Sequence, residues 1–171
     1  MAKKTYTNKD NIGYRISQIH SLKFSFKDIE IERLNQIFET RNALALNTST
    51  SLNIDKEKST IIIDINTQLV DNEKENVLVE HSGRTVYIVK GLDSVYNEDE
   101  NNFDLPDGLV IQLFSIAYSH ARALLATEIS PTIYKDKYML PVIDPRVFLK
   151  KDNKKKSQCP TMVTVAQAFN S

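Results

Sequence analysis

Two hydrophobic periods follow one another along this chain, and their order constrains the fold more than any other feature of the sequence. Over residues 44–89 apolar and polar residues alternate, which is typical of strands that bury one face. From Leu109 to Ser130 apolar residues recur every three or four positions, and Pro131 then stops the pattern. A run of strands followed by one long helix predicts an α+β fold in which the helix lies on the sheet.

Four strands are predicted, joined by polar turns. They cover residues 14–26, 44–54, 60–70 and 77–89. Short polar turns favour hairpins over parallel crossovers, so we expect a four-stranded antiparallel meander followed by the long helix and a C-terminal segment. Ser82-Gly83 interrupts the last strand, and a glycine within a strand usually marks a β-bulge or a close approach of the backbone. Asp107 is expected to cap the long helix through its carboxylate.

The remaining segments have weaker patterns. Residues 28–41 fit neither period and form either an irregular connection or a short helix from Ile31 to Phe38. Five lysines in the seven residues 150–156 indicate a solvated linker, and the apolar residues after it predict one or two turns of helix. We therefore expect a flexible N-terminus over residues 1–13, one domain over 14–149, and a basic linker and tail over 150–171.

Charge and cysteine content exclude several classes of protein. The chain has 22 basic and 22 acidic residues, so no net field directs it to nucleic acid or to anionic lipid. Cys159 is the only cysteine, which excludes an intrachain disulfide and a cysteine-rich zinc site. No window approaches the ~18 apolar residues of a membrane span. These features predict a cytoplasmic protein without membrane insertion.

Residues that carry chemistry are sparse. The three histidines, His20, His81 and His120, are widely spaced and match no metal-binding motif. The four glycines have no spacing that would cradle a phosphate, and Ser82-Gly83 lacks the preceding glycine of a nucleophile elbow. We predict no catalytic residue, no metal and no cofactor, so the protein is not expected to be an enzyme. Such a chain is expected to act through an apolar surface that binds extended peptides.

Several motifs, taken in order, resemble those of a known family. They are Tyr14, Ile16 and Ile19 with Phe24-Ser25-Phe26; Glu80-His81-Ser82-Gly83; the helix sequence Ser115-Ile116-Ala117-Tyr118-Ser119-His120-Ala121-Arg122; Tyr134; and Pro141-Val142-Ile143. In this order the chain resembles the SecB-type protein-export chaperones over roughly residues 14–149. It departs from them at Leu113-Phe114, where the family has Cys-Pro, and at Pro131-Thr132-Ile133, where the family has a glycine turn.

The resemblance implies a function, a set of partners and two sets of residues. It implies an ATP-independent holdase that binds unfolded clients, either preproteins or an antitoxin, and that assembles as a homotetramer from two dimers with the long helices between them. Client-binding positions would be Ile29, Ile31, Leu34, Ile37, Phe38, Tyr87, Met162, Val165 and Phe169. Oligomer contacts would come from Ile116, Tyr118, His120 and Arg122. The family's acidic C-terminal region is replaced by lysines, which puts docking on the SecA translocase motor in doubt.

Two alternatives remain open at this point. A small acyl thioesterase of the hot-dog type also wraps a sheet around a long helix, although that helix usually lies between its first two strands. A non-enzymatic adaptor that binds its partner through the basic tail is the other. Neither alternative requires a nucleic acid partner.

Overall fold

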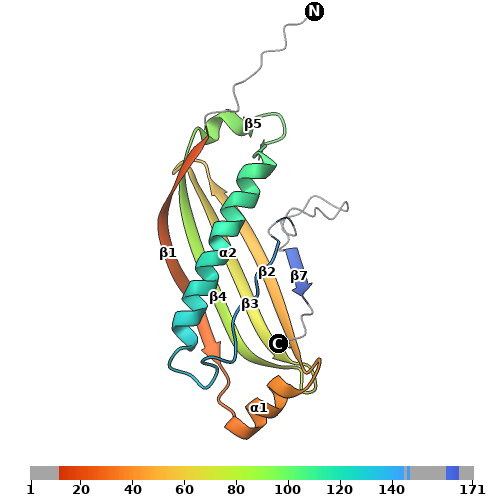
Figure 1. The fold of residues 1–171 in the computed structure, drawn as a ribbon. Helices are drawn as coiled ribbons and strands as arrows, with labels where there is room; N and C mark the ends of the chain where they lie inside the picture. Colours follow the sequence, from red (N-terminus) through yellow and green to blue (C-terminus); the bar gives the residue numbers. More distant parts are fainter. Residues whose placement is uncertain (1–11, 145, 147–160, 166–171) are drawn as a thin grey trace, which may run out of the picture.

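The computed structural model describes residues 12–144, 146 and 161–165, which form a single sheet with a long helix on one face (Figure 1). The main elements are β1 (Gly13–Phe26), α1 (Ile31–Glu39), β2 (Leu44–Asp55), β3 (Thr60–Asp71), β4 (Asn76–Lys90), α2 (Asp107–Ile129) and β7 (Thr161–Val165). Between β4 and α2 lie a short 3-10 helix (Leu92–Val95) and a small hairpin of β5 (Tyr96–Asn97) and β6 (Asn102–Phe103). The predicted helix from Ile31 is thus confirmed as α1.

The sheet has the strand order β1-β4-β3-β2-β7, and every neighbouring pair is antiparallel. The predicted α+β fold, a four-stranded antiparallel sheet followed by a long helix, is confirmed. Strands β2, β3 and β4 form the predicted meander, but β1 lies beyond β4 at one edge of the sheet. α2 crosses the sheet diagonally and packs mainly on β4, with further contacts to β3 and β1 (Figure 1).

The core lies between α2 and the sheet because both elements present apolar residues there. Ile61, Ile63 and Ile65 alternate along β3 and are each 0% exposed, as the period-two pattern predicts. Leu113 and Leu125 of α2 cover this face and are buried. Burial of each such side chain contributes about 1.5–3 kcal/mol. The hydroxyl of buried Tyr87 donates to the carbonyl of Leu113 at 2.8 Å, so this polar group enters the core without losing its hydrogen bond.

Gly83 marks a close approach of α2 to β4. It pairs in register with Ile65 and with Ser21, and a Cβ added to it would lie 3.3 Å from both Cα and Cβ of Ala121. The irregularity predicted at Ser82-Gly83 is present in the ladder, but its extra residue lies in the partner strand: the pairing of β1 with β4 shifts register between Ser21 and Lys23, opposite Gly83 and Ser82. A second shift lies between Ile16 and Gln18. Glycine is needed because α2 rests directly on the strand.

The start of α2 also differs from expectation. Asp107 is the first helical residue, and no side chain caps the helix. The carbonyl of Pro106 accepts hydrogen bonds from the amides of Leu109 and Val110 at 2.9 and 3.1 Å. The predicted Asp107 cap is wrong because Pro106, held in the extended conformation, occupies the N-cap position.

α2 is long and apolar enough to cross a membrane on length and composition alone, contrary to our reading of the sequence. Here it packs on the sheet, and core helices of globular proteins meet the same test. Only 33% of its most apolar 18-residue window is buried within the chain. Other large apolar residues of α2, such as Leu109, Val110 and Ile116, are partly buried against the core.

The predicted helical turns in the tail are wrong for residues 161–165, which form strand β7 on β2. Thr161, Val163 and Val165 are β-branched at every second position, which favours an extended strand, and the edge of β2 offers backbone groups to pair with. The predicted linker at 150–156 and the expected N-terminus up to residue 11 lie outside the described residues.

Candidate functional site

Large apolar side chains are exposed along the edge strand β1. We call Ile16, Ile19, Leu22 and Phe26, which are 40%, 42%, 45% and 44% exposed, the β1 strip. Proteins usually place charges or prolines on long edge strands, because an apolar edge with unpaired backbone groups recruits other chains. β1 carries two cations beside these positions, Arg15 and Lys23, and Lys23 is paired with Glu80, so the four apolar side chains still make up most of the strip. It is therefore the surface of the described chain most suited to contact another polypeptide.

The register of β1 with β4 explains why the strip exists. Ile16, Ile19 and Phe26 pair with Tyr87, Thr85 and Val79, all buried residues on the face covered by α2. Residues paired directly across an antiparallel ladder share a face, so these three side chains lie on the α2 side. α2 packs chiefly on β4 and leaves them partly uncovered. Leu22 falls in a bulge and borders a hollow on the other face.

One end of the strip is fixed by aromatic contacts. Phe26 lies 5.9 Å from Phe24 and 6.3 Å from Tyr134, measured between ring centroids. The hydroxyl of Tyr134 donates to the carbonyl of Lys27 at 2.8 Å, which ties the segment after α2 to the end of β1. Burial raises the pKa of Tyr134 to about 12, so this donor keeps its proton across the physiological range. The end of the strip is therefore held in one position.

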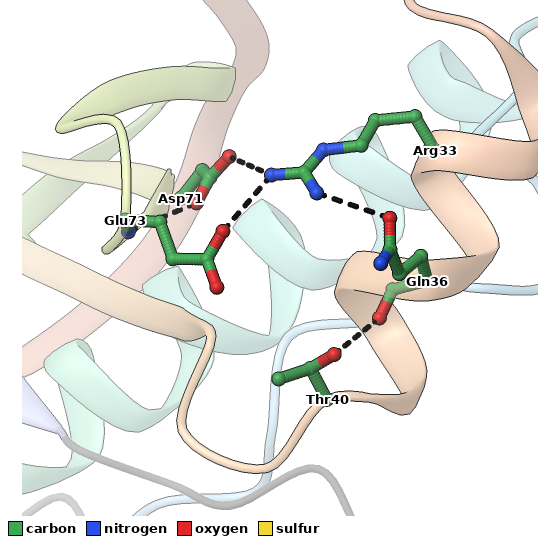
Figure 2. Close-up of polar contacts among 5 residues, drawn as sticks. All are labelled: Arg33, Gln36, Thr40, Asp71 and Glu73. Carbon is green, nitrogen blue, oxygen red and sulfur yellow. Dashed lines mark hydrogen bonds and ion pairs between the residues drawn. The ribbon is translucent and has the colours of Figure 1, made fainter.

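α1 lies past the same end of the sheet and is attached to it by a charged cluster (Figures 1 and 2). Arg33 contacts Glu73 Oε2 at 3.0 Å and the buried Asp71 Oδ2 at 3.8 Å, both at the β3–β4 turn. The same guanidinium donates to Gln36 Oε1 at 3.1 Å. The Thr40 hydroxyl donates to the Gln36 carbonyl at 2.7 Å and closes the last turn of the helix. Arg33 thus fixes α1 against the hairpin.

The predicted client-binding residues are divided by the structure. Leu34, Ile37 and Tyr87 are 0%, 3% and 0% exposed and belong to the core, so in this conformation they offer no surface to a client, and their client-binding role stays a prediction. The physical reason is that α1 is amphipathic and packs these residues inward. Ile31 is 56% exposed, while Ile29 and Phe38 are partly buried against the core.

The C-terminal candidates are less fully described. Met162 and Val165 lie in β7, opposite Ser49 and Leu46 of β2, whereas Phe169 lies outside the described residues. The β1 strip itself was not among the predicted client-binding residues. Alternation in β1 was read as a sign of a strand, but the sequence alone does not show that β1 is an edge strand or that α2 leaves it uncovered.

The predicted oligomer residues on α2 have partners within the chain. Tyr118 is 5% exposed, its hydroxyl donates to the carbonyl of Pro141 at 2.9 Å, and burial raises its pKa to about 12. Arg122 Nε donates to the carbonyl of Leu140 at 2.9 Å. His120 Nδ1 lies 3.1 Å from the hydroxyl of Thr85. Ile116 packs partly on the core. Tyr118 therefore offers little surface to a second copy.

Two histidines lie at the interface between α2 and the sheet. His81 is 0% exposed, and its Nε2 lies 3.2 Å from the hydroxyl of Ser21. Burial lowers the pKa of His81, an effect that the negative charge of Glu128 partly opposes. Burial also lowers the pKa of His120. Over the described part of the chain, no cluster of histidine, cysteine or carboxylate side chains could hold a metal ion.

A polar hollow of about 510 Å³ lies mainly on the face of the sheet opposite α2. The side chains that border it include Asn47, Asn66, Gln68, Glu80 and Ser82. Lys23 pairs with Glu80 at 2.6 Å and lowers the pKa of that carboxyl. Gln68 also bonds to Glu80 at 3.3 Å, and Ser82 bonds to Asn66 at 2.6 Å. These groups satisfy one another, as expected for the solvated face of a one-layer sheet.

No family model matches the sequence, and no curated protein matches it. Among solved structures, the fold is similar to a SecB-like chaperone of Mycobacterium tuberculosis in complex with an antitoxin peptide, with 9% identity and a TM-score of 0.45, over 76% of this chain and 89% of that chain. It is also similar to a Streptococcus agalactiae protein of unknown function, with 12% identity and a TM-score of 0.41, over 77% of this chain and 98% of that chain.

Proposed function

We propose that this protein is an ATP-independent chaperone that holds unfolded or aggregation-prone polypeptides on exposed apolar surface. The single observation that carries the proposal is the β1 strip, in which four large apolar side chains, Ile16, Ile19, Leu22 and Phe26, are each 40–45% exposed on an edge strand. Isolated exposed apolar residues are common on soluble proteins, but a row of them along an unpaired strand edge indicates a binding surface.

The strip has the dimensions and chemistry for an extended client. From residue 16 to residue 26 the strand rises about 33 Å, at ~3.3 Å per residue, which matches a client segment of about ten residues. Covering the exposed part of each side chain removes roughly 75 Å² from water and contributes about 2 kcal/mol at ~25 cal/mol per Å². Ordering a flexible client offsets much of this sum. Each contact is then weak, and affinity comes from several of them together.

Ile31 extends the proposed surface around the end of the sheet. It lies on α1, is 56% exposed, and is flanked in sequence by the partly buried Ile29. Val77, at the start of β4, is 40% exposed near the same end, where the amide of Lys27 donates to the carbonyl of Leu78. Arg33 holds α1 in place, so this apolar patch has a fixed position relative to Phe26. We propose that it receives the apolar residues of a client that continues past the strip.

Several large apolar residues of α2 are only partly buried within the single chain, and this supports the proposal of a homotetramer built from two dimers. A second copy laid on this helix would cover partly buried residues such as Ile116 and Leu124. Tyr118, His120 and Arg122 would act indirectly, because each already has a partner within the chain.

The clients we propose are preproteins awaiting export or an antitoxin, and the proposed compartment is the cytoplasm. These are the client classes that the sequence resemblance implies. The lysines at 150–156 give no acidic surface for the family's docking on the SecA motor, so we propose that clients are held without it.

The test compares aggregation of a chemically denatured model protein with and without the full chain, followed by light scattering. The variant Ile16→Thr/Ile19→Thr keeps β-favouring residues in β1 but removes two of the four large apolar side chains of the strip. We expect at least a tenfold higher chaperone concentration for half-maximal suppression. The control is Met139→Thr/Val142→Thr, which removes two apolar residues that are 64% and 77% exposed outside the strip. Equal suppression by both variants, or none by the wild type, would refute the proposal.

A further inference from the structure

The edge of the sheet opposite β1 is paired in an unusual way, by a five-residue strand from the chain's own C-terminal region. β7 runs antiparallel to β2, with Thr161 opposite Thr50, Val163 opposite Thr48 and Val165 opposite Leu46. β2 spans twelve residues, Leu44–Asp55, so β7 pairs with less than half of its length. The remainder of the β2 edge presents backbone groups to solvent or to another chain.

β7 depends on β2 for its position. Its principal contacts within the described chain are with β2, and no other element packs on it to a comparable extent. Short strands held by one ladder are marginal in water, because each backbone hydrogen bond replaces hydrogen bonds to water and stabilises the strand only slightly. Residues 147–160 separate β7 from Arg146, so the strand is joined to the fold through a connection rather than a tight hairpin. Such a strand can exchange with one from another chain.

The partners of β7 on β2 are suited to an added strand. Leu46, Thr48 and Thr50 are 1%, 4% and 6% exposed and alternate with the polar Asn47 and Ser49. An extended segment placed there gains main-chain hydrogen bonds from β2, and every second residue shares the face of the buried row. Thr161, Val163 and Val165 supply β-branched residues at those register positions. The tail therefore shows which sequence pattern this edge accepts.

We infer that the β2 edge is a strand-addition site for extended polypeptide segments with β-branched residues at alternate positions, and that residues 161–165 occupy it in cis. This inference rests on the proposed function for the identity of the competing chain, an extended client. It adds a second binding edge to the β1 strip, which lies at the other side of the sheet. A client must displace β7 before it can pair with residues 46–50 of β2.

The covalent connection of β7 to the rest of the chain determines how strongly β7 competes with a free peptide for β2. A tethered strand competes at an effective concentration in the millimolar range, so a free peptide present at micromolar concentration cannot displace it. A chain whose β7 cannot pair loses this competition and binds the same peptide at its intrinsic affinity. We expect the apparent dissociation constant to fall at least tenfold. A client segment would face the same competition from β7. The edge of β2 would therefore bind only segments that pair with it better than β7 does, or segments of a client that also binds the β1 strip.

The experiment uses the full chain and a labelled synthetic peptide with the sequence of residues 159–167. In the variant Met162→Pro/Val163→Pro two adjacent residues lose their amide hydrogens. Every second amide of β7 points toward β2, so one of the two prolines must remove a hydrogen bond of the ladder. The control Ser157→Pro/Gln158→Pro places the same change before β7. Fluorescence anisotropy measures peptide binding, and hydrogen exchange follows those amides of residues 46–50 that point away from β3.

We expect tight peptide binding by the β7 variant alone, with weak binding by the wild type and the control. The same β2 amides should exchange faster in the variant and recover protection when peptide is added. Equal peptide binding by all three proteins would overturn the inference, and so would an unchanged rate of amide hydrogen exchange in the variant. It would also be overturned if, in a mixture of labelled wild-type chains, β7 of one copy paired with β2 of another. The proposed function is tested separately, by measuring how well the same three proteins suppress aggregation of a denatured client. If the peptide binds as expected but aggregation is not suppressed, only the proposed chaperone function is contradicted.

Discussion

Gly83→Ala tests the close packing of α2 on β4. The added Cβ would lie 3.2 Å from His81 Cε1 and 3.3 Å from Cα and Cβ of Ala121. Carbon atoms prefer separations of ~3.5–4.0 Å, so α2 or β4 has to move by a few tenths of an ångström. Ala121 Cα belongs to the helix backbone and cannot rotate away. The methyl group therefore pushes the two elements apart.

The expected magnitude follows from two opposing effects. Overpacking a core contact costs about 1–3 kcal/mol. Replacing glycine by alanine restricts the unfolded chain and returns about 0.4–1 kcal/mol. We therefore expect Gly83→Ala to lower the free energy of unfolding by about 1–2 kcal/mol, which corresponds to a fall of roughly 2–8 °C in Tm for a domain of this size.

Urea denaturation followed by circular dichroism measures the effect. Gly108→Ala is the matched control, because nothing lies within 4 Å of its added Cβ and alanine is the better helix former; it should be neutral or stabilising by up to about 1 kcal/mol. Ala121→Gly removes one of the clashing atoms but costs about 1 kcal/mol by itself, because glycine is a poor helix former. In a double-mutant cycle we therefore expect a coupling energy of about 1 kcal/mol, so that Ala121→Gly costs less in the Gly83→Ala background than in the wild type. A neutral Gly83→Ala variant, or a cycle without coupling, would show that α2 does not rest on β4 as described.

Two further predictions concern pH and the attachment of α1. Because burial lowers the pKa of His81 and His120 in the folded protein, the unfolded chain binds more protons, and stability should fall as pH drops below about 6.5, by at most about 1.4 kcal/mol per pH unit for each histidine. Replacing both histidines with glutamine should make the free energy of unfolding, measured in urea, less dependent on pH between pH 7.5 and 5. The same pH dependence in this variant as in the wild type would contradict the prediction. Arg33→Met leaves buried Asp71 without its cation and should cost about 1–2 kcal/mol and speed amide exchange in α1, whereas Glu73→Gln, at a 60% exposed side chain, should cost less than about 0.5 kcal/mol. If the two variants lowered the free energy of unfolding equally, Arg33 would not be attaching α1 to the sheet through Asp71.

The main strands and the long helix could be predicted because the apolar residues of each recur with one regular spacing along its whole length. The alternation in β3 places Ile61, Ile63 and Ile65 on one face, and the structure buries all three. The three- and four-residue spacing from Leu109 predicts α2 because helices of that length bury one continuous stripe. Such patterns depend on local geometry, so they are readable without knowledge of the partner element.

The remaining features depend on contacts between distant segments. Whether a strand lies at an edge depends on sheet order, so the exposure of Ile16 and Ile19 does not follow from the sequence of β1. The sequence of residues 28–41 does not show that Leu34 and Ile37 point into the core, because the contact of Arg33 with the β3–β4 turn, which holds α1 there, joins distant segments. The five residues of β7 carry too weak a pattern to distinguish strand from helix without the edge that pairs with them.

The pairing of β1 with β4 also has a consequence for folding during synthesis. His20 pairs with Arg84, so the first strand to leave the ribosome finds its ladder partner only after about sixty more residues have been added. At ~5–20 residues per second this delay is roughly 3–13 s, during which β2 and β3 can form their hairpin without it. Throughout that interval both edges of β1, with Ile16, Ile19 and Phe26, are open. The nascent chain would itself need protection from aggregation before its own sheet is complete.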